Sequence, residues 1–195
     1  MAVVGAILAG GLARRLGGGD KPLRLLAGRP LLAHVAERLR PQVDRLILNA
    51  NGDPARFATF GIEVVPDSVP GNPGPLAGIL ACLETATDAD WVVTVPGDAP
   101  FLPADLAMRL VAAGPAAASS RGRRHPVIGA WRPGQARRLA ELLASGERRV
   151  GVFAADAGVV EWPAEPVDPF MNLNEPADFA AAEALITASA GYGRG

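Results

Sequence analysis

The chain has 195 residues, of which 49% are hydrophobic and 20% are charged, and a chain of this length can bury its own core as one domain. Its formal net charge is -1, so the chain lacks the net positive charge that is typical of nucleic-acid-binding proteins. The single cysteine, Cys82, excludes an internal disulfide and favours a reducing compartment. No apolar run approaches the ~18 residues of a membrane-spanning helix. We therefore expect a cytoplasmic protein with no nucleic-acid or membrane partner.

Short runs of β-forming residues alternate with helical patterns along most of the chain, which is typical of an α/β fold with a parallel sheet covered by helices. Strands are predicted at residues 3–8, 45–49, 62–65, 91–95 and 127–131, with weaker candidates at 116–120 and 159–162. Helices are predicted from Leu31 to just before Pro41 and at residues 76–85, 103–113, 135–144 and 176–186. We expect residues 1–187 to form one domain and the small, glycine-rich residues 188–195 to form a disordered tail.

Polar residues follow four of the predicted strands at the point where each strand ends. The first strand runs into a glycine-rich segment that ends at Lys21, and the others lead to Asn49, Asp67 and Asp98. Because ligands of open α/β sheets bind outside the carboxyl ends of the strands, we expect these residues to share one edge.

The glycine-rich segment after the first strand combines Gly10 and Gly11 with the cations Arg14, Arg15 and Lys21, which is the only lysine of the chain. Glycines let backbone N–H groups approach an anion, so this composition suits a polyphosphate. The segment is neither a P-loop nor a dinucleotide fingerprint, because Lys21 is followed by proline and no G-x-G-x-x-G occurs there. A flexible glycine turn with solvated arginines is the alternative.

Asp98 follows the apolar strand predicted at residues 91–95, and nearby prolines stiffen its turn. A carboxylate held at a strand end opposite a phosphate-binding segment is a candidate Mg²⁺ ligand, with phosphate oxygens and water completing the coordination. In isolation, a turn aspartate or a helix cap would be the commoner interpretation.

Several motifs together resemble the molybdenum cofactor guanylyltransferases, which make molybdopterin guanine dinucleotide. They are Leu8-Ala9-Gly10-Gly11, Arg14-Arg15, Gly18-Gly19-Asp20-Lys21-Pro22-Leu23, Gly28-Arg29-Pro30-Leu31, Asn49-Ala50-Asn51, Asp67-Ser68, Pro73-Gly74-Pro75-Leu76-Ala77-Gly78, Gly97-Asp98-Ala99-Pro100, Glu147-Arg148-Arg149-Val150 and Phe170-Met171-Asn172-Leu173-Asn174-Glu175-Pro176. The resemblance extends to about Leu185, and the combination is specific although each motif alone is weak.

The resemblance implies a nucleotidyltransferase that uses GTP, with a Rossmann-like, mostly parallel sheet covered by helices on both faces, of the nucleotide-diphospho-sugar transferase type. It assigns nucleotide binding to Leu8, Ala9, Gly10, Gly11, Lys21, Asn49, Asp67 and Asp98, the Mg²⁺ ion to Asp98, and catalysis to Lys21, Arg15 and Asp98. In the implied reaction, the terminal phosphate of molybdopterin attacks the α-phosphorus of GTP and pyrophosphate leaves.

The resemblance also implies how the acceptor binds. It assigns the pterin to Asn172 and Asn174, and to Pro75, Leu76 and Gly78 in the wall between the two substrates. Transient contacts with molybdenum cofactor biosynthesis proteins and molybdoenzyme chaperones are expected on the same ground. Glu175 departs from the threonine that is usual in the family, and we expect it to cap the helix that follows.

Three alternatives remain at this point: a molybdopterin cytidylyltransferase, a sugar-phosphate nucleotidyltransferase, and a non-catalytic nucleotide-binding protein of the same fold. The second glycine of Leu8-Ala9-Gly10-Gly11 favours guanine, because it leaves room for a purine. Two basic clusters are candidates for attracting an anionic pterin or for plain solvated surface. They are formed by Arg121, Arg123, Arg124 and His125, and by Arg148 and Arg149.

Overall fold

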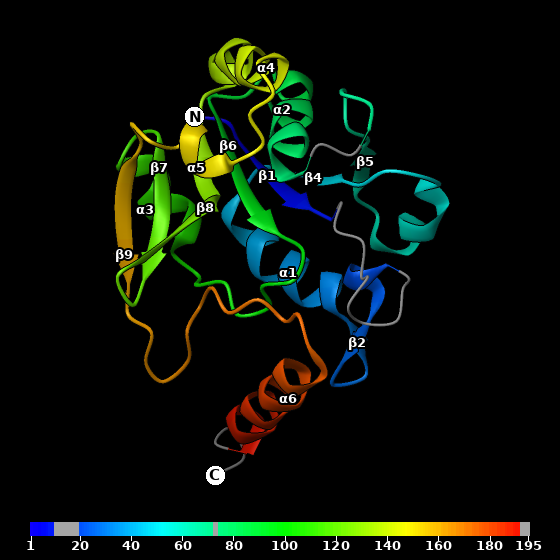
Figure 1. The fold of residues 1–195 in the computed structure, drawn as a ribbon. Helices are drawn as coiled ribbons and strands as arrows, with labels where there is room; N and C mark the ends of the chain where they lie inside the picture. Colours follow the sequence, from blue (N-terminus) through cyan, green and yellow to red (C-terminus); the bar gives the residue numbers. More distant parts are fainter. Residues whose placement is uncertain (10–19, 72–73, 192–195) are drawn as a thin grey trace.

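The computed structural model describes residues 1–9, 20–71 and 74–191 (Figure 1). Within these residues, a seven-stranded sheet has the strand order β5-β4-β1-β6-β8-β7-β9. Its strands are β1 (Val3–Leu8), β4 (Arg45–Asn49), β5 (Glu63–Val65), β6 (Trp91–Pro96), β7 (Ala116–Ser120), β8 (Arg123–Trp131) and β9 (Gly158–Trp162). A short separate hairpin consists of β2 (Leu25–Leu26) and β3 (Arg29–Pro30).

The direction of the strands fixes where the polar strand ends meet. β5, β4, β1 and β6 are neighbours that pair in parallel, so their carboxyl ends lie at one edge of the sheet. β8 is antiparallel to both β6 and β7, and β9 pairs in parallel with β7. The prediction of a mostly parallel sheet is confirmed, and the four polar strand ends share one edge.

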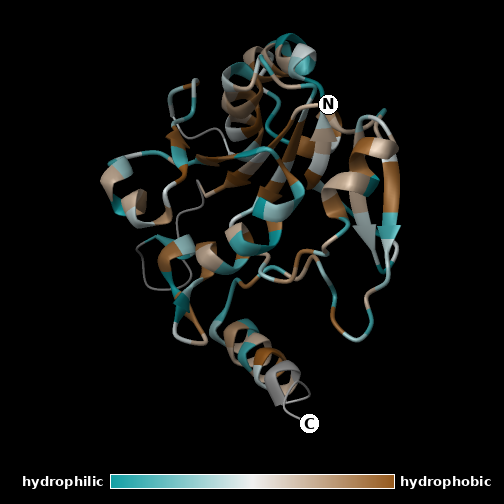
Figure 2. Cartoon of the chain, turned by 180° about the vertical axis from the view of Figure 1, so that it is seen from behind, coloured by the Kyte–Doolittle hydropathy of each residue, from teal (hydrophilic) through white to brown (hydrophobic). Residues whose placement is uncertain are grey.

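Helices cover both faces of the sheet, as Figure 1 shows for α1 and α2. Their bounds are α1 (Leu31–Leu39), α2 (Pro75–Thr85), α3 (Leu106–Ala112), α4 (Ala136–Ala144), α5 (Val150–Phe153) and α6 (Pro176–Gly191). One core cluster holds apolar side chains of α1 and α3, and another holds those of α2, α4 and α5. Side chains of β1 alternate between them, because successive strand residues point to opposite faces. In Figure 2 the central strands are accordingly the most hydrophobic part of the chain.

The observed helices and strands differ from the predicted ones mainly in where they begin and end, and in short elements that were not predicted. β8 begins at Arg123, four residues before its predicted start at 127, because a tight turn joins it directly to β7. Arg121 and Gly122 form that turn with φ of 53° and 69°, the left-handed pair that two-residue hairpins require. The helix predicted at 103–113 begins only at Leu106.

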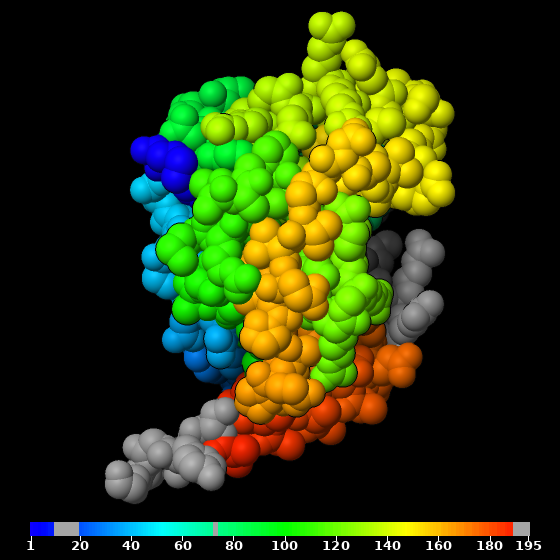
Figure 3. Space-filling view, turned by 90° about the vertical axis from the view of Figure 1, so that its left-hand side faces the viewer, coloured from blue at the N-terminus to red at the C-terminus, as the bar shows by residue number. Residues whose placement is uncertain are grey.

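The C-terminal helix α6 packs on the β2–β3 hairpin. Leu26, Leu31, Leu173 and Ala182 form a small buried cluster there, and the backbone N–H of Ala27 donates to Glu183 at 3.1 Å. α6 continues to Gly191, beyond the predicted end at 186, so it includes the first residues of the segment that was expected to be disordered. In Figure 3, α6 and the segment before it run along one end of the molecule. No helix of the described chain has the length and apolar character needed to cross a bilayer.

Candidate active site

The structure brings Lys21, Asp98 and Asn174 together at the carboxyl edge of the sheet. The ammonium of Lys21 donates hydrogen bonds to Oδ2 of Asp98 and, at 2.7 Å, to Oδ1 of Asn174. Lys21 opens the short helix η2 (Lys21–Leu23), Asp98 lies in the turn after β6, and Asn174 lies just before α6. The Lys21 and Asp98 side chains are only 12% and 18% exposed, so this ion pair is partly shielded from water.

Backbone hydrogen bonds hold Asp98 in place from two sides. The N–H of Gly97 donates to the carbonyl of Leu8 at 2.9 Å, and the carbonyl of Asp98 accepts from the N–H of Leu173 at 3.0 Å. The turn is therefore tied both to the end of β1 and to the segment before α6. A Cβ at position 97 would lie 3.3 Å from the Leu8 carbonyl oxygen, so glycine allows this close approach.

The second carboxylate oxygen of Asp98 has an open coordination position. Oδ1 is buried and accepts no hydrogen bond from the described residues. A buried carboxylate oxygen without a donor is costly unless a cation or a ligand group satisfies it. The described residues contain no group of three or more His, Cys, Asp or Glu side chains that could hold a metal ion. Asp98 therefore suits an ion that takes most of its ligands from phosphate and water, as Mg²⁺ does.

A second polar cluster follows β4 and β5. The Asn49 amide donates to Oδ1 of Asp67 at 2.9 Å, and the Asn51 amide donates to Oδ2 at 2.8 Å. The backbone N–H of Asp67 donates in return to Oδ1 of Asn51 at 2.9 Å. Both carboxylate oxygens of Asp67 are thus fixed, and Asn49 is only 2% exposed. Asn51 was not among the predicted site residues, although it lies two positions after Asn49.

Arg56 was missed by the sequence analysis. Its Nη1 bonds to Oδ1 of Asp20 at 2.6 Å, and its Nη2 donates to the carbonyl of Asn51 at 2.5 Å. Asp20 directly precedes Lys21, so Arg56, from the helix η4 (Pro54–Phe60), ties the lysine's segment to the Asn51 side of the site. Nothing in the sequence signals this pair, because Asp20 and Arg56 lie 36 residues apart and belong to no common motif.

The remaining residues predicted for the nucleotide lie at the end of β1 or outside the described chain. The N–H of Ala9 donates to the carbonyl of Asn49 at 2.8 Å, and the Leu8 carbonyl is bound by Gly97. The Ala9 N–H and the Leu8 carbonyl therefore tie the end of β1 to its neighbours β4 and β6 in this structure. Gly10, Gly11 and Arg15 lie outside the described residues.

The five residues predicted for the pterin fall into two groups. Pro75, Leu76 and Gly78 lie in the first turn of α2, where Leu76 is fully buried, and a Cβ at Gly78 would lie 2.2 Å from Oδ1 of Asn49. Asn172 and Asn174 instead line a cavity together with residues of β7 and β8. The backbone N–H of Asn174 donates to Asp178 at 2.7 Å.

Glu175 occupies the expected cap position before α6, because its carbonyl accepts the N–H groups of Asp178 at 3.0 Å and Phe179 at 3.4 Å. The capping carboxylate, however, comes from Asp178, whose Oδ2 accepts the N–H groups of Asn174 and Glu175. A side chain that reaches back in this way is half of a capping box. Although glutamate replaces the usual threonine at position 175, the backbone N–H groups of Asn174 and Glu175 therefore still have a hydrogen-bond acceptor before α6.

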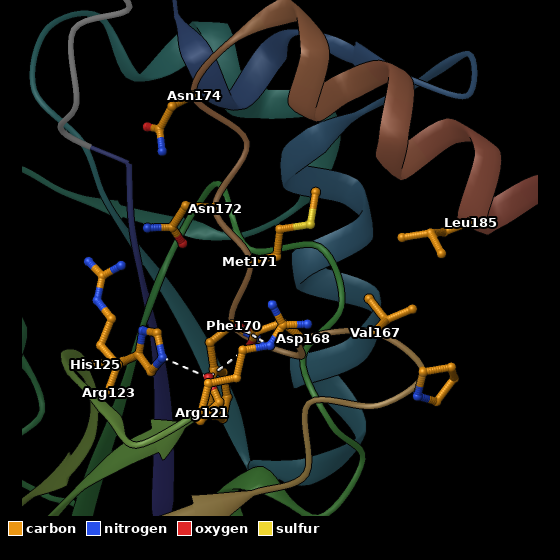
Figure 4. Close-up of a pocket in the computed structure, with 12 residues that line it drawn as sticks. Arg121, Arg123, His125, Val167, Asp168, Phe170, Met171, Asn172, Asn174 and Leu185 are labelled. Atoms are coloured by element: carbon orange, nitrogen blue, oxygen red, sulfur yellow. Dashed lines mark hydrogen bonds and ion pairs between the residues drawn. The ribbon is translucent and has the colours of Figure 1, made fainter.

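The cavity has a volume of about 570 Å³ and lies between the β7–β8 turn, the segment before α6 and α6 itself (Figure 4). The residues that line it are Ser120, Arg121, Arg123, His125, Pro166, Val167, Asp168, Phe170, Met171, Asn172, Asn174 and Leu185. Asn174 belongs both to this cavity and to the Lys21 cluster, so the two are contiguous. The volume is that of a small-molecule site.

The two basic clusters differ in what their arginines do. Arg121 and Arg123 line the cavity, whereas Arg124 donates to the carbonyls of Ala154 and Ala157. Arg148 donates to the carbonyl of Leu143, and Arg149 pairs with Glu147. Only the first cluster therefore contributes charge to the cavity.

Two side chains near the site, Cys82 and His125, have pKa values that differ from their ordinary ones. Burial raises the pKa of the Cys82 thiol to about 12, with a smaller contribution from Asp67, so this cysteine is an inert core residue, as the sequence indicated. Burial also lowers the pKa of His125 below its ordinary value.

Comparisons with known proteins identify the domain. The sequence pattern of the MobA-like NTP transferase domain matches residues 5–157. A solved structure described as molybdopterin-guanine dinucleotide biosynthesis protein A from Archaeoglobus fulgidus superposes with a TM-score of 0.76 at 24% identity, covering 95% of this chain and 99% of that one. A 4-diphosphocytidyl-2C-methyl-D-erythritol synthase from Anaerococcus prevotii has a TM-score of 0.73 at 15% identity, covering 95% and 96%. The fold and the domain pattern define a MobA-like nucleotidyltransferase.

Curated relatives narrow this class. A molybdenum cofactor guanylyltransferase of Rhodopseudomonas palustris (strain BisB5) is 53% identical over 192 residues, covering 92% of this chain and 91% of the relative. A protein of the same name from Bradyrhizobium sp. (strain ORS 278) is 52% identical over 197 residues, covering 94% and 93%. The chain belongs to the molybdenum cofactor guanylyltransferase family, and the alternative nucleotidyltransferase and non-catalytic interpretations are not favoured.

Proposed function

We propose that this protein transfers GMP from GTP to the terminal phosphate of molybdopterin, forming molybdopterin guanine dinucleotide and pyrophosphate. The observation that carries the proposal is the Lys21–Asp98–Asn174 cluster, which shares Asn174 with the cavity. Asp98 follows β6, which lies in the sheet between the strands β4 and β5 that lead to Asn49 and Asp67 and the strands β8 and β7 that border the cavity. GTP is assigned to the Asn49–Asp67 side and the pterin to the cavity side. The reacting phosphates then meet at Lys21 and Asp98.

The lysine ammonium suits this position because of its geometry. It has three protons, and two of them are directed at Asp98 and Asn174. No acceptor among the described residues takes the third proton, which we assign to a phosphate oxygen that enters between the two substrates. Lys21 thus holds negative charge next to the reacting phosphorus while Asp98 and Asn174 fix its direction. Arg15 is assigned to the same triphosphate on the family resemblance.

The unsatisfied Oδ1 of Asp98 fits a Mg²⁺ ion. When bound, the ion would neutralise charge on the triphosphate and on the departing pyrophosphate. The acceptor oxygen forms the new bond to the α-phosphorus of GTP as the bond to the β-phosphate bridging oxygen breaks. Phosphoryl transfer of this kind depends mainly on positioning and charge neutralisation, so the protein needs no covalent nucleophile.

Asn49 and Asp67 are assigned to the nucleoside, and their mutual hydrogen bonds preorganise them. Ala9, Leu8, Gly10 and Gly11 would line the nucleotide on the β1 side. The protein would work in the cytoplasm, where it meets molybdenum cofactor biosynthesis proteins and molybdoenzyme chaperones only transiently.

The direct test is pyrophosphate release. The full chain, incubated with GTP, Mg²⁺ and molybdopterin, is expected to release one pyrophosphate for each dinucleotide formed. Replacement of GTP by CTP is expected to abolish release, and GTP is expected to raise the melting temperature more than CTP does, because only a bound ligand stabilises the folded state. Equal stabilisation by CTP, or release without molybdopterin, would contradict the proposal.

Gly78→Ala tests the role of Asn49. The added Cβ would lie 2.2 Å from Oδ1 of Asn49, so Asn49 must move and lose its hydrogen bonds to Asp67 and to the Val65 carbonyl. We expect GTP affinity to fall by about tenfold, or about 1.4 kcal/mol, in an isothermal titration. Gly151→Ala is the matched control, since a Cβ there meets nothing within 4 Å. Unchanged affinity in Gly78→Ala would exclude Asn49 from nucleotide binding.

A further inference from the structure

Ser120, His125 and Asp168 form a hydrogen-bonded relay in the wall of the cavity. Figure 4 shows His125 and Asp168 at the end of the cavity opposite Asn174. The Ser120 hydroxyl lies 2.9 Å from Oδ1 of Asp168 and 2.8 Å from Nε2 of His125. A carboxylate can only accept, so the single hydroxyl proton is donated to Asp168. The hydrogen bond to His125 must then use a proton on Nε2, with the serine oxygen as the acceptor.

This assignment determines what the other ring nitrogen offers. A neutral imidazole has one proton, so Nδ1 of His125 has a lone pair and accepts hydrogen bonds. Burial lowers the pKa of His125, and the positive charge of Arg123 lowers it further. The carboxylates of Asp168 and Glu161 raise this pKa, but the net shift is downward. The ring is therefore neutral near pH 7. No donor among the described residues bonds to Nδ1, and the ring lines the cavity.

The same arrangement argues against a hydrolytic Ser-His-Asp triad. In such a triad the histidine accepts the serine proton and the aspartate holds the other ring nitrogen. Here the serine donates directly to the aspartate, and Ser120 is only 1% exposed. The relay fixes a histidine tautomer and does not activate a nucleophile.

The surroundings of Nδ1 complete a recognition surface for a flat heterocycle. Arg123 and Asn172 line the same cavity and offer hydrogen-bond donors, and the amide of Asn172 also offers an acceptor. The His125 and Phe170 rings pack at 5.1 Å between centroids and form an apolar wall with Met171. Figure 4 shows Asn174, Asn172 and His125 following one another along one side of the cavity.

We infer that Nδ1 of His125, with Arg123 and Asn172, binds the amino-lactam edge of the acceptor's pterin ring and thereby selects a pterin as the group that receives GMP. This edge of the pterin presents N–H donors next to a carbonyl oxygen. The N–H groups match the lone pair on Nδ1 of His125, and the carbonyl oxygen matches the guanidinium of Arg123. With the ring held there, the opposite end of the acceptor lies toward Asn174 and Lys21. The inference rests on the proposed function and names the part of the acceptor that the cavity recognises.

Direct binding of a soluble pterin to the full chain tests this inference without the transfer reaction. 6-Hydroxymethylpterin is titrated against the wild type, His125→Phe and His125→Gln, with pterin fluorescence as the signal. Phe keeps a ring and removes the acceptor, whereas Gln offers an N–H to Ser120 and a carbonyl oxygen to the cavity. We expect the Kd to rise at least about tenfold in His125→Phe and less than about threefold in His125→Gln. Arg149→Ala, from the basic cluster outside the cavity, is the control and should bind as the wild type does.

Kinetics and pH give two further readouts. In the complete assay, His125→Phe should raise the KM for molybdopterin and leave the KM for GTP and kcat within about threefold of the wild type. Pterin affinity of the wild type should fall as the pH is lowered through the pKa of His125, because a protonated Nδ1 donates instead of accepting. His125→Gln should lack this dependence.

The outcomes separate the inference from the proposed function. Wild-type pterin affinity in His125→Phe, or an equal loss in Arg149→Ala, would overturn the inference. A GTP-induced rise in melting temperature that equals that of the wild type shows that a weak-binding variant is folded. If pterin binds as expected but no pyrophosphate is released with GTP, the proposed transfer fails while pterin recognition by His125 stands.

Discussion

Replacing Asp98 with asparagine is expected to lower the rate of GMP transfer by about 10²- to 10³-fold, the scale seen when one electrostatic group is removed from a catalytic site. The amide keeps the size of the side chain and can still accept a hydrogen bond from Lys21. It lacks the negative charge that strengthens the binding of a divalent ion, and its Nδ2 would occupy the position of a carboxylate oxygen. The loss should appear in kcat at saturating GTP and Mg²⁺.

The Asp98 variant is expected to keep its fold. The backbone carbonyl of Asp98, and not its side chain, bonds to Leu173, so the turn is retained. Circular dichroism and the melting temperature provide the control, together with GTP binding measured without Mg²⁺. A folded variant that transfers GMP at the wild-type rate at millimolar Mg²⁺ would remove Asp98 from the metal site.

Lys21→Arg is expected to lower the transfer rate by at least about tenfold, or ~1.4 kcal/mol, although the charge is unchanged. The ammonium is a compact group whose protons point in three directions, and two are taken by Asp98 and Asn174. A planar guanidinium is larger and directs its donors in one plane. In a side chain that is only 12% exposed, it cannot meet both partners and a phosphate from the same position.

Lys21→Met extends this test, because it keeps an unbranched side chain, one atom shorter, and removes the charge. We expect a larger loss than in Lys21→Arg, with kcat reduced more than GTP affinity. Arg149→Lys is the control for exchanging the two cations at an exposed position and should leave the rate unchanged. Equal rates in the wild type and Lys21→Arg would reject the requirement for a point charge.

The sequence predicted the strands and helices that carry a long apolar pattern. β1 and β4 have the predicted bounds, and so does β7, which was the weaker candidate at 116–120; each is a buried run bounded by turn residues. The β2–β3 hairpin and α5 were missed because their segments contain two and four residues, too few for any periodicity. The first half of β8 was missed because Arg123, Arg124 and His125 are exposed or half-buried polar residues.

The residues of the site that follow parallel strands could be predicted from the sequence. Contacts between side chains that only the tertiary fold brings together could not. The approach of Lys21 to Asp98 follows from the rule that ligand-binding loops gather at the carboxyl edge of parallel strands. The Arg56–Asp20 and Ser120–Asp168 contacts join residues that lie 36 and 48 positions apart in the chain. No spacing rule links such residues, so only the folded chain reveals the relay and its effect on His125.

A crystal structure of the full chain with GTP and Mg²⁺ tests the assignment of the Lys21–Asp98 pair most directly. We expect the ion to be bound to a carboxylate oxygen of Asp98 and to phosphate oxygens, with Nζ of Lys21 on the triphosphate and the guanosine next to Asn49 and Asp67. A triphosphate bound away from this edge, with Lys21 still paired only to Asp98 and Asn174 and no metal on Asp98, would contradict it.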